Sequence, residues 1–268
     1  MKSMFRCSAG VIMLACYALF STGCDAEDPD EGTLKAIAFA PGGTLRYQTT
    51  LTTTVTGFDG VVRSTSSDID TFAVNVSPTS EDIPGIPNTL QLDLFDPAEP
   101  ALRDAVWYIQ NDSQLVEVAY RNGETGAPAL GIKRSPAFER FVTAWRTVEG
   151  RVAGTPGDIQ IRADPRVVVT FPLEIGSRWT SFTDPWLQVR EALREEPLDV
   201  PAGTFDCVVV ETITMEDNPE NGHFTDHVTS AGLVQRVYQY DSDARDAENQ
   251  LIGTLFFETR FVLIGRDR

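Results

Sequence analysis

Residues 45–56, with the sequence LRYQTTLTTTVT, alternate between apolar and polar side chains. The apolar members share one parity: Leu45, Tyr47, Leu51 and Val55. A period of two is typical of an antiparallel strand that buries one face and exposes the other. The Asp-Gly pair at residues 59–60 follows closely, and it accepts the positive φ angles of a tight turn. The segment therefore predicts a strand that leads into a hairpin.

The same alternation recurs along the rest of the chain. It is found at residues 72–76, 90–94, 116–120, 167–171, 207–214, 233–240 and 251–264. At about 3.3 Å per residue, the last of these strands would extend roughly 46 Å, a length typical of strongly curved sheets and barrels. The predicted fold class is therefore mainly β, with a large antiparallel, strongly curved sheet that resembles a half-open barrel.

One segment has helical spacing instead. Pro136 stands at a first-turn position, and apolar side chains follow at Phe138, Phe141, Val142 and Trp145, with a glycine beyond them. Proline near the start and glycine near the end are typical of a helix. We expect one short helix over residues 136–148, packed on the sheet.

The length and charge of the chain limit its organisation and its partners. A chain of 268 residues with 42% hydrophobic residues fits a single β-rich domain, which we place at residues 35–268, with potential halves at 35–150 and 165–268. The formal net charge is −17. Because binding to nucleic acid depends on lysine and arginine side chains at the phosphates, we expect no nucleic-acid partner.

The N-terminus has the features of an export signal. Lys2 and Arg6 precede residues 7–20, an apolar stretch that is too short to span a bilayer but suits a signal-peptide core. The sequence STGC at residues 21–24 follows and resembles the bacterial lipobox, although Ser21 occupies a position that is usually leucine. The resemblance implies a lipoprotein signal peptide at residues 1–23 and lipidation of Cys24. The alternative is an ordinary signal peptide in which Cys24 has no role.

The residues after Cys24 support an anchor. Residues 25–31 are acidic and contain proline, so we expect residues 24–34 to form a flexible tether. Each buried methylene contributes about 0.8 kcal/mol, and two or more acyl chains give stable anchoring. The predicted location is the bacterial cell envelope, with the membrane as a partner through the lipid on Cys24 and the domain outside the cytoplasm.

Three motifs in the second half resemble a large group of poorly characterised bacterial secreted proteins and lipoproteins. They are FPLEIGSRW at residues 171–179, VPAGTFDC at residues 200–207 and AGLV at residues 231–234. Gly176 permits a sharp turn into a strand that Trp179 anchors in the core, and Pro201 and Gly203 suit a tight connection. The resemblance implies a half-open barrel similar to the lipoprotein-carrier proteins of the bacterial envelope. It implies no catalytic or binding residue.

Few residues suggest chemistry. His223 and His227 lie on either side of Asp226, and this trio is a weak candidate for a metal site, because zinc needs three or four ligands. We expect the histidines on the surface or on an edge strand instead. Cys207 has apolar neighbours, which favours a buried, unreactive thiol. We expect no cofactor, and we identify no catalytic residues.

Carboxylates are the remaining candidates. Residues 241–249 contain four acids, but Arg245 and Asp246 occupy positions where a calcium loop needs an oxygen ligand and a glycine, so we expect a solvated hairpin loop. The favoured hypothesis is a non-catalytic envelope lipoprotein whose curved sheet binds an apolar small molecule or an envelope protein. The alternatives are a carboxylate-based hydrolase acting on envelope polysaccharide and a purely structural lipoprotein. The sequence leaves enzymatic activity open and favours its absence.

Overall fold

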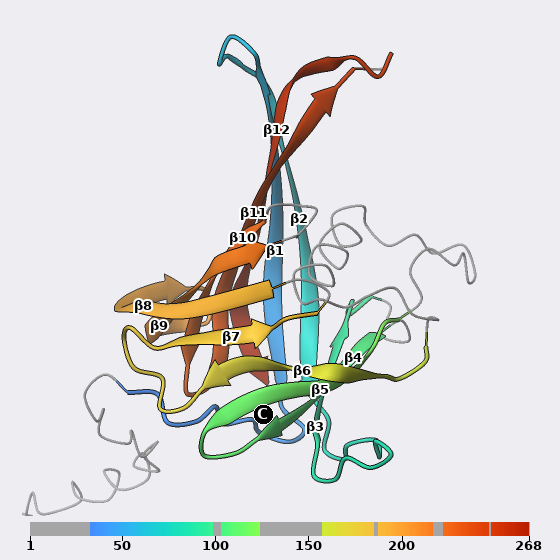
Figure 1. The fold of residues 1–268 in the computed structure, drawn as a ribbon, viewed down its shortest axis with the longest axis vertical. Coiled ribbons are helices and arrows are strands. Elements are labelled where there is room, and N and C mark those ends of the chain that lie inside the picture. The colour runs from blue at the N-terminus through green and yellow to red at the C-terminus, as the bar shows by residue number, and fades with distance from the viewer. Residues whose placement is uncertain are drawn as a thin grey trace, which may run out of the picture. The chain divides into compact units, whose positions relative to one another are not determined.

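The computed structural model describes residues 33–98, 103–123, 157–184, 187–216, 222–246 and 248–267. These residues form twelve β-strands (Figure 1). The strands are β1 (Thr44–Gly57), β2 (Val62–Val76), β3 (Leu90–Phe95), β4 (Arg103–Gln110), β5 (Gln114–Arg121), β6 (Gln160–Thr170), β7 (Arg178–Phe182), β8 (Leu187–Val200), β9 (Gly203–Glu216), β10 (His223–Thr229), β11 (Gly232–Arg245) and β12 (Leu251–Asp267). The predicted signal peptide and Cys24 lie outside the described residues, as do most of the predicted tether and the helix predicted at residues 136–148.

All twelve strands belong to one sheet, and every pair of neighbours is antiparallel. The order is β6-β5-β4-β3-β2-β1-β12-β11-β10-β9-β8-β7. The first six strands therefore form one meander and the last six form another. The two meanders join where β1 pairs with β12 along the whole of β1, from Thr44 opposite Asp267 to Gly57 opposite Gly253.

The two edge strands, β6 and β7, meet through side chains, without a backbone ladder among the described residues. The indole Nε1 of Trp179 and the hydroxyl of Ser181 both donate hydrogen bonds to the carbonyl oxygen of Val167, at 3.2 and 2.8 Å. The hydroxyl and the backbone NH of Thr183 donate to Asp164 at 2.9 Å. The curved sheet is therefore a nearly closed barrel, and these donors protect an edge that would otherwise be open.

An aromatic cluster packs inside the barrel at the junction of the two meanders. Tyr47 of β1 stacks on Phe72 of β2 with ring centroids 5.0 Å apart, and Phe261 of β12 contacts both rings edge-on, at 6.0 and 5.6 Å. Stacked and edge-on pairs contribute about 0.5–1.5 kcal/mol beyond the area that they bury. The inward parity predicted for Tyr47 is confirmed.

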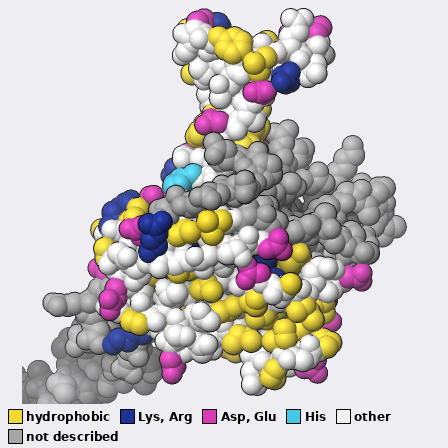
Figure 2. All heavy atoms as spheres, in the orientation of Figure 1, with side chains coloured by type: hydrophobic (Ala, Val, Ile, Leu, Met, Phe, Trp, Pro, Cys, Tyr) yellow, Lys and Arg dark blue, Asp and Glu magenta, His cyan; other side chains and the backbone are white. Residues whose placement is uncertain are grey.

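Strands β1, β2, β11 and β12 continue beyond the barrel as a long arm (Figure 1). Much of its surface is polar, but apolar side chains are exposed near its tip, including Phe58, Val62 and Leu251 (Figure 2). The turn predicted at residues 59–60 is present, and Gly60 has a φ of 75°.

The structure confirms strands in every segment where the sequence alternates, including β1 and β12. Strands β4, β8 and β10 lie outside the segments where the alternation predicts a strand, and β4 and β8 lack it for different reasons. β4 is buried on both faces, because Val106 and Tyr108 face the barrel interior while Ala105 and Trp107 pack in a separate cluster with Ile83. β8 has polar residues on its buried face, including Gln188 and Arg190, so neither strand has a simple apolar alternation.

The arm depends on a close approach of two backbones at Gly253. A Cβ at this position would overlap the carbonyl oxygen of Thr56, whereas a Cβ at Gly265 of the same strand would meet nothing within 4 Å. We therefore expect Gly253→Ala to destabilise the arm by about 1–3 kcal/mol, the typical cost of forcing extra volume into a packed site. Amide hydrogen exchange at residues 54–57 should accelerate about tenfold or more.

Gly265→Ala is the matched control, and exchange in the arm should be unchanged in this variant. Equal effects of the two substitutions, or none, would contradict the pairing of Thr56 with Thr254 and of Gly57 with Gly253.

Candidate functional site

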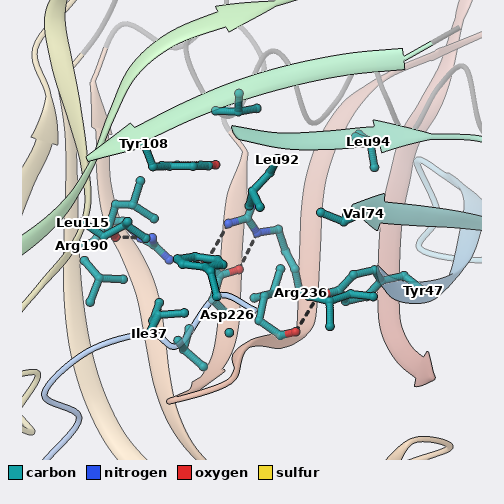
Figure 3. A pocket seen from close by; sticks show the side chains of 18 residues that line it. Ile37, Tyr47, Val74, Leu92, Leu94, Tyr108, Leu115, Arg190, Asp226 and Arg236 are labelled. Carbon is teal, nitrogen blue, oxygen red and sulfur yellow. Dashed lines mark hydrogen bonds and ion pairs between the residues drawn. The ribbon is translucent and has the colours of Figure 1, made fainter. Parts of the chain in front are cut away.

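The barrel contains a partly open cavity of about 110 Å³ (Figure 3). Its wall is mainly aliphatic and aromatic, with side chains such as Val74 of β2, Leu94 of β3, Leu115 of β5 and Leu233 of β11. An engineered apolar cavity of about 150 Å³ in another protein binds benzene. The cavity in this barrel is somewhat smaller, so it accommodates only a small apolar group. A longer chain would have to continue beyond the cavity.

The segment that precedes β1 forms part of the cavity wall. The backbone NH and carbonyl of Ile37 exchange hydrogen bonds with the side-chain amide of Gln110, at 3.2 and 3.1 Å, and the NH of Ala38 donates to the carbonyl of Ser230. Leu34 pairs with Leu173 in an isolated bridge. These bonds hold the side chains of Ile37 and Phe39 against the cavity.

Three charged side chains lie on the otherwise apolar wall. Asp226 of β10 accepts hydrogen bonds from Arg190 of β8 at 2.5 Å and from Arg236 of β11 at 2.5 and 2.7 Å (Figure 3). The three side chains are only 1–7% exposed. β10 is the direct neighbour of β11, and one strand, β9, lies between β10 and β8. We call this group the Arg–Asp–Arg cluster.

Aromatic rings fix both arginines in place. The guanidinium carbons of Arg190 and Arg236 each lie 4.9 Å from the ring centre of Phe224, and Arg190 also lies 5.8 Å from that of Trp179. Arg190 additionally donates a hydrogen bond from Nη1 to the carbonyl of Val168 at 3.0 Å. Cation–π contacts between desolvated groups contribute about 2 kcal/mol each.

The electrostatics of the cluster leave it positively charged. Burial alone would raise the pKa of Asp226, but the charges of Arg236 and Arg190 outweigh burial, so the pKa lies below its ordinary value. Burial lowers the pKa of Arg190 to about 10, against the opposing effect of Asp226. Asp226 and Arg190 are therefore ionised at neutral pH. Because arginine keeps its charge in proteins, the three side chains together carry two positive charges and one negative charge.

A second group of buried charges lies at β5 and β6. Glu117 pairs with Arg162 at 2.6 Å and with Arg166 at 2.9 Å, and all three side chains are almost fully buried. Among the described residues, the other buried carboxylates are Asp93, which contacts Gln91 and Ser77, and Asp104, which accepts the NH of Gly123. A carboxylate-based hydrolase needs a buried acid with a raised pKa, whereas the pKa of Asp226 is lowered.

The structure does not bring the three candidate metal ligands together. His223 and His227 point to the face of β10 opposite Asp226, whose carboxylate is engaged by the two arginines. His223 contacts the carbonyl of Thr212, and the Nε2 of His227 lies 2.8 Å from Glu196. No group of three or more potential metal ligands occurs within the described ranges.

Two further expectations can be compared with the structure. β10 is an interior strand, because it lies between β9 and β11. His227 is buried, so the expectation that the histidines lie on the surface or on an edge strand is wrong for this residue. Cys207 is buried in an apolar cluster, and burial raises the pKa of its thiol to about 11. At neutral pH it is therefore a protonated thiol that packs as a small apolar group.

Sequence analysis missed Arg190 and Arg236, the residues that distinguish this cavity from an ordinary core. The available signal was their parity. Arg190 shares its parity with the buried Ala192, and Arg236 shares its parity with the buried Val234 and Tyr238. A charged residue on the apolar face of a predicted strand marks a buried ion pair or a binding group.

Comparisons with known proteins detect similarity only at the level of structure. No family model matches the chain, and no curated protein is similar to it in sequence. A chain from Bacteroides fragilis NCTC 9343, described as an exported protein with a YmcC-like fold, aligns with a TM-score of 0.41 and 12% identity. A chain described as a lipoprotein, from Parabacteroides distasonis ATCC 8503, aligns with a TM-score of 0.33 and 12% identity. Each alignment covers 88% of this chain and 100% of the other.

Both TM-scores are low, so neither match indicates a function for this chain. Within the part of the chain that the structure describes, no helix combines the length and the hydropathy needed to cross a bilayer.

The Arg–Asp–Arg cluster predicts a large effect of one substitution on stability. Asp226→Asn leaves two buried guanidinium groups without their shared carboxylate, and breaking a buried pair typically costs about 3–5 kcal/mol. Chemical denaturation at pH 7 should show a loss of this order. Asp243→Asn, which removes an exposed partner of Arg245, should cost less than about 0.5 kcal/mol.

The pH dependence follows from the lowered pKa of Asp226. Its stabilising effect is fully present above the unfolded-state pKa of about 4 and is lost as the pH falls through the lower folded-state value. The stability difference between wild type and Asp226→Asn should therefore persist at pH 5 and narrow below about pH 4. A stability difference between the two proteins that stays constant down to pH 2 would contradict the ionised Asp226 as the group that stabilises the two arginines.

Proposed function

We propose that this chain is a non-catalytic lipoprotein of the bacterial cell envelope that binds an apolar ligand inside its barrel. The observation that supports ligand binding is the cavity, which is lined by side chains from both meanders. Protein interiors contain few voids larger than a water molecule.

One or two larger side chains would fill the cavity. Val74, Val106 and Val228 on the cavity wall are all small enough to be replaced by leucine or phenylalanine. A cavity kept open among such residues favours occupation by a ligand, because a bound apolar group restores the missing contacts. The cavity thus supports the ligand-binding hypothesis over an interaction module or a purely structural lipoprotein.

The proposed location rests on the N-terminal sequence. The cationic start, the apolar core and the cysteine at position 24 support export followed by lipidation, and the acidic residues 25–31 would separate the lipid from the domain. The lipid on Cys24 would then hold the barrel at a membrane surface.

Lipidation predicts a change of cell fraction. Cys24→Ser removes the acceptor, so we expect the protein to move from the membrane fraction to the soluble fraction of the envelope. Cys207→Ala should remain with the membrane, because Cys207 is buried in the barrel. Mass spectrometry of the N-terminal peptide should show a diacylglyceryl group on Cys24. An unmodified thiol at Cys24 in a released protein would contradict the anchor.

Ligand binding can be tested with Nile red, a neutral dye whose fluorescence rises in apolar surroundings. The dye is larger than the cavity, so we expect part of it to enter the cavity and the rest to lie at the opening. The mature chain carrying Cys24→Ser should bind it with saturation at about one site. Val74→Trp places a large side chain in the cavity and should weaken binding at least about tenfold. Ile69→Ser lies on the same strand but removes an exposed side chain, so it should leave binding unchanged.

Leu94→Phe adds less volume to the cavity than Val74→Trp does, so the affinity for Nile red should fall by an intermediate amount. This variant still tests the site if Val74→Trp is poorly folded. Non-saturable binding of the dye, or equal binding by the cavity variants and Ile69→Ser, would reject the cavity as the ligand site.

A further inference from the structure

We propose that the ligand is an anionic amphiphile, whose headgroup pairs with Arg190 while its hydrocarbon chain occupies the apolar part of the cavity. This inference rests on the proposed ligand-binding function and specifies the chemical class of the ligand. It is based on the charge of the Arg–Asp–Arg cluster, the open donor on Arg190 and the apolar wall beside them.

The charge of the cluster favours an anion. Among the described residues, the carboxylate that pairs with Arg190 is Asp226, and Asp226 also pairs with Arg236 in two hydrogen bonds. The field of Arg166, which itself pairs with Glu117, also lowers the pKa of Arg190. Since a buried charge is strongly unfavourable unless it is compensated, a negatively charged group in this cavity would be stabilised.

Arg190 also has an unused hydrogen-bond donor. Its Nη1 donates to Val168 and its Nη2 to Asp226, but its Nε has no partner in the described structure, although the side chain is 1% exposed. Buried donors are almost always satisfied in folded proteins. A ligand oxygen at this nitrogen would supply the missing bond, and an arginine NH paired with an oxyanion forms one of the stronger hydrogen bonds.

The arrangement is already organised for such a ligand. Contacts with Phe224, Trp179, Val168 and Asp226 fix the guanidinium of Arg190, so little side-chain entropy is lost on binding. Figure 3 shows Arg190 in the wall of the same cavity as Leu115, Val74 and Leu94. A charged position that adjoins an apolar wall matches a molecule with an anionic head and a hydrocarbon chain.

The test compares probes that share an eight-carbon chain and differ in their headgroups. Octanoate, octyl sulfate, octan-1-ol and octylammonium each compete with Nile red for the mature Cys24→Ser chain. We expect the anions to displace the dye at concentrations at least about tenfold lower than octan-1-ol, and octylammonium to be the weakest competitor. The ratio between octanoate and octyl sulfate distinguishes a carboxylate from a tetrahedral oxyanion.

Arg190→Gln provides the matched variant. It leaves Asp226 paired with Arg236 and removes the excess positive charge, so the preference for the anions should disappear while octan-1-ol still binds. Arg194→Gln changes an exposed arginine of the same strand and should keep the preference.

The outcomes separate this inference from the proposed function. If octanoate and octan-1-ol displace the dye equally from the mature Cys24→Ser chain, the ligand does not need an anionic headgroup. An unchanged preference for the anions in Arg190→Gln would show that Arg190 does not bind the headgroup. Either result would leave the proposed binding of an apolar ligand intact. Absence of saturable Nile red binding would overturn the proposed function itself. If Arg190→Gln does not fold, the comparison of the four probes on the mature Cys24→Ser chain still tests the preference for an anion.

Discussion

The pairing of β1 with β12 is the constraint on which the rest of the structure depends. It joins the two ends of the described domain along the full length of β1 and places both strands at the centre of the sheet. Each meander then extends outward, so β6 and β7, which are neighbours in the sequence, become the two edges of the sheet. Curvature brings these edges together, and Trp179 and Ser181 connect them through hydrogen bonds to Val167. This pairing joins residues that are far apart in the sequence, so local interactions within either strand cannot replace it.

The same arrangement creates the cavity and its charge. Antiparallel strands place every second side chain inside the barrel, which brings residues from the two meanders to a common wall. Arg190, Asp226 and Arg236 lie on the inward parity of β8, β10 and β11, and each is almost fully buried. Placing ionised groups there opposes folding unless they are paired, and Asp226 pairs both arginines at once.

The sequence predicted the elements that bury one face and failed where that condition does not hold. β1 and β12 alternate clearly, so their positions and inward residues such as Tyr47 could be inferred. β4 is buried on both faces, which removes the alternation. Asp226 was considered as a metal ligand beside His223 and His227, yet in a strand it must point away from both, as the structure shows. The parity of Arg190 and Arg236 could mark them as buried charges, but their meeting at Asp226 could not be inferred, because a sequence does not reveal which strands are neighbours around a barrel. The helix at residues 136–148 and the lipidation of Cys24 stay predictions.

The most direct test of the account is to locate a bound amphiphile by methyl NMR on isotopically labelled leucine, valine and isoleucine side chains. If the barrel interior is the ligand site, saturating octanoate should shift the methyl signals of Val74, Leu94, Leu115 and Leu233, which line the cavity. The methyl signals of the exposed Ile69 and Leu251 on the arm should not move. Shifts that are confined to the arm, or spread over the surface without saturation, would show that the cavity is not a binding site.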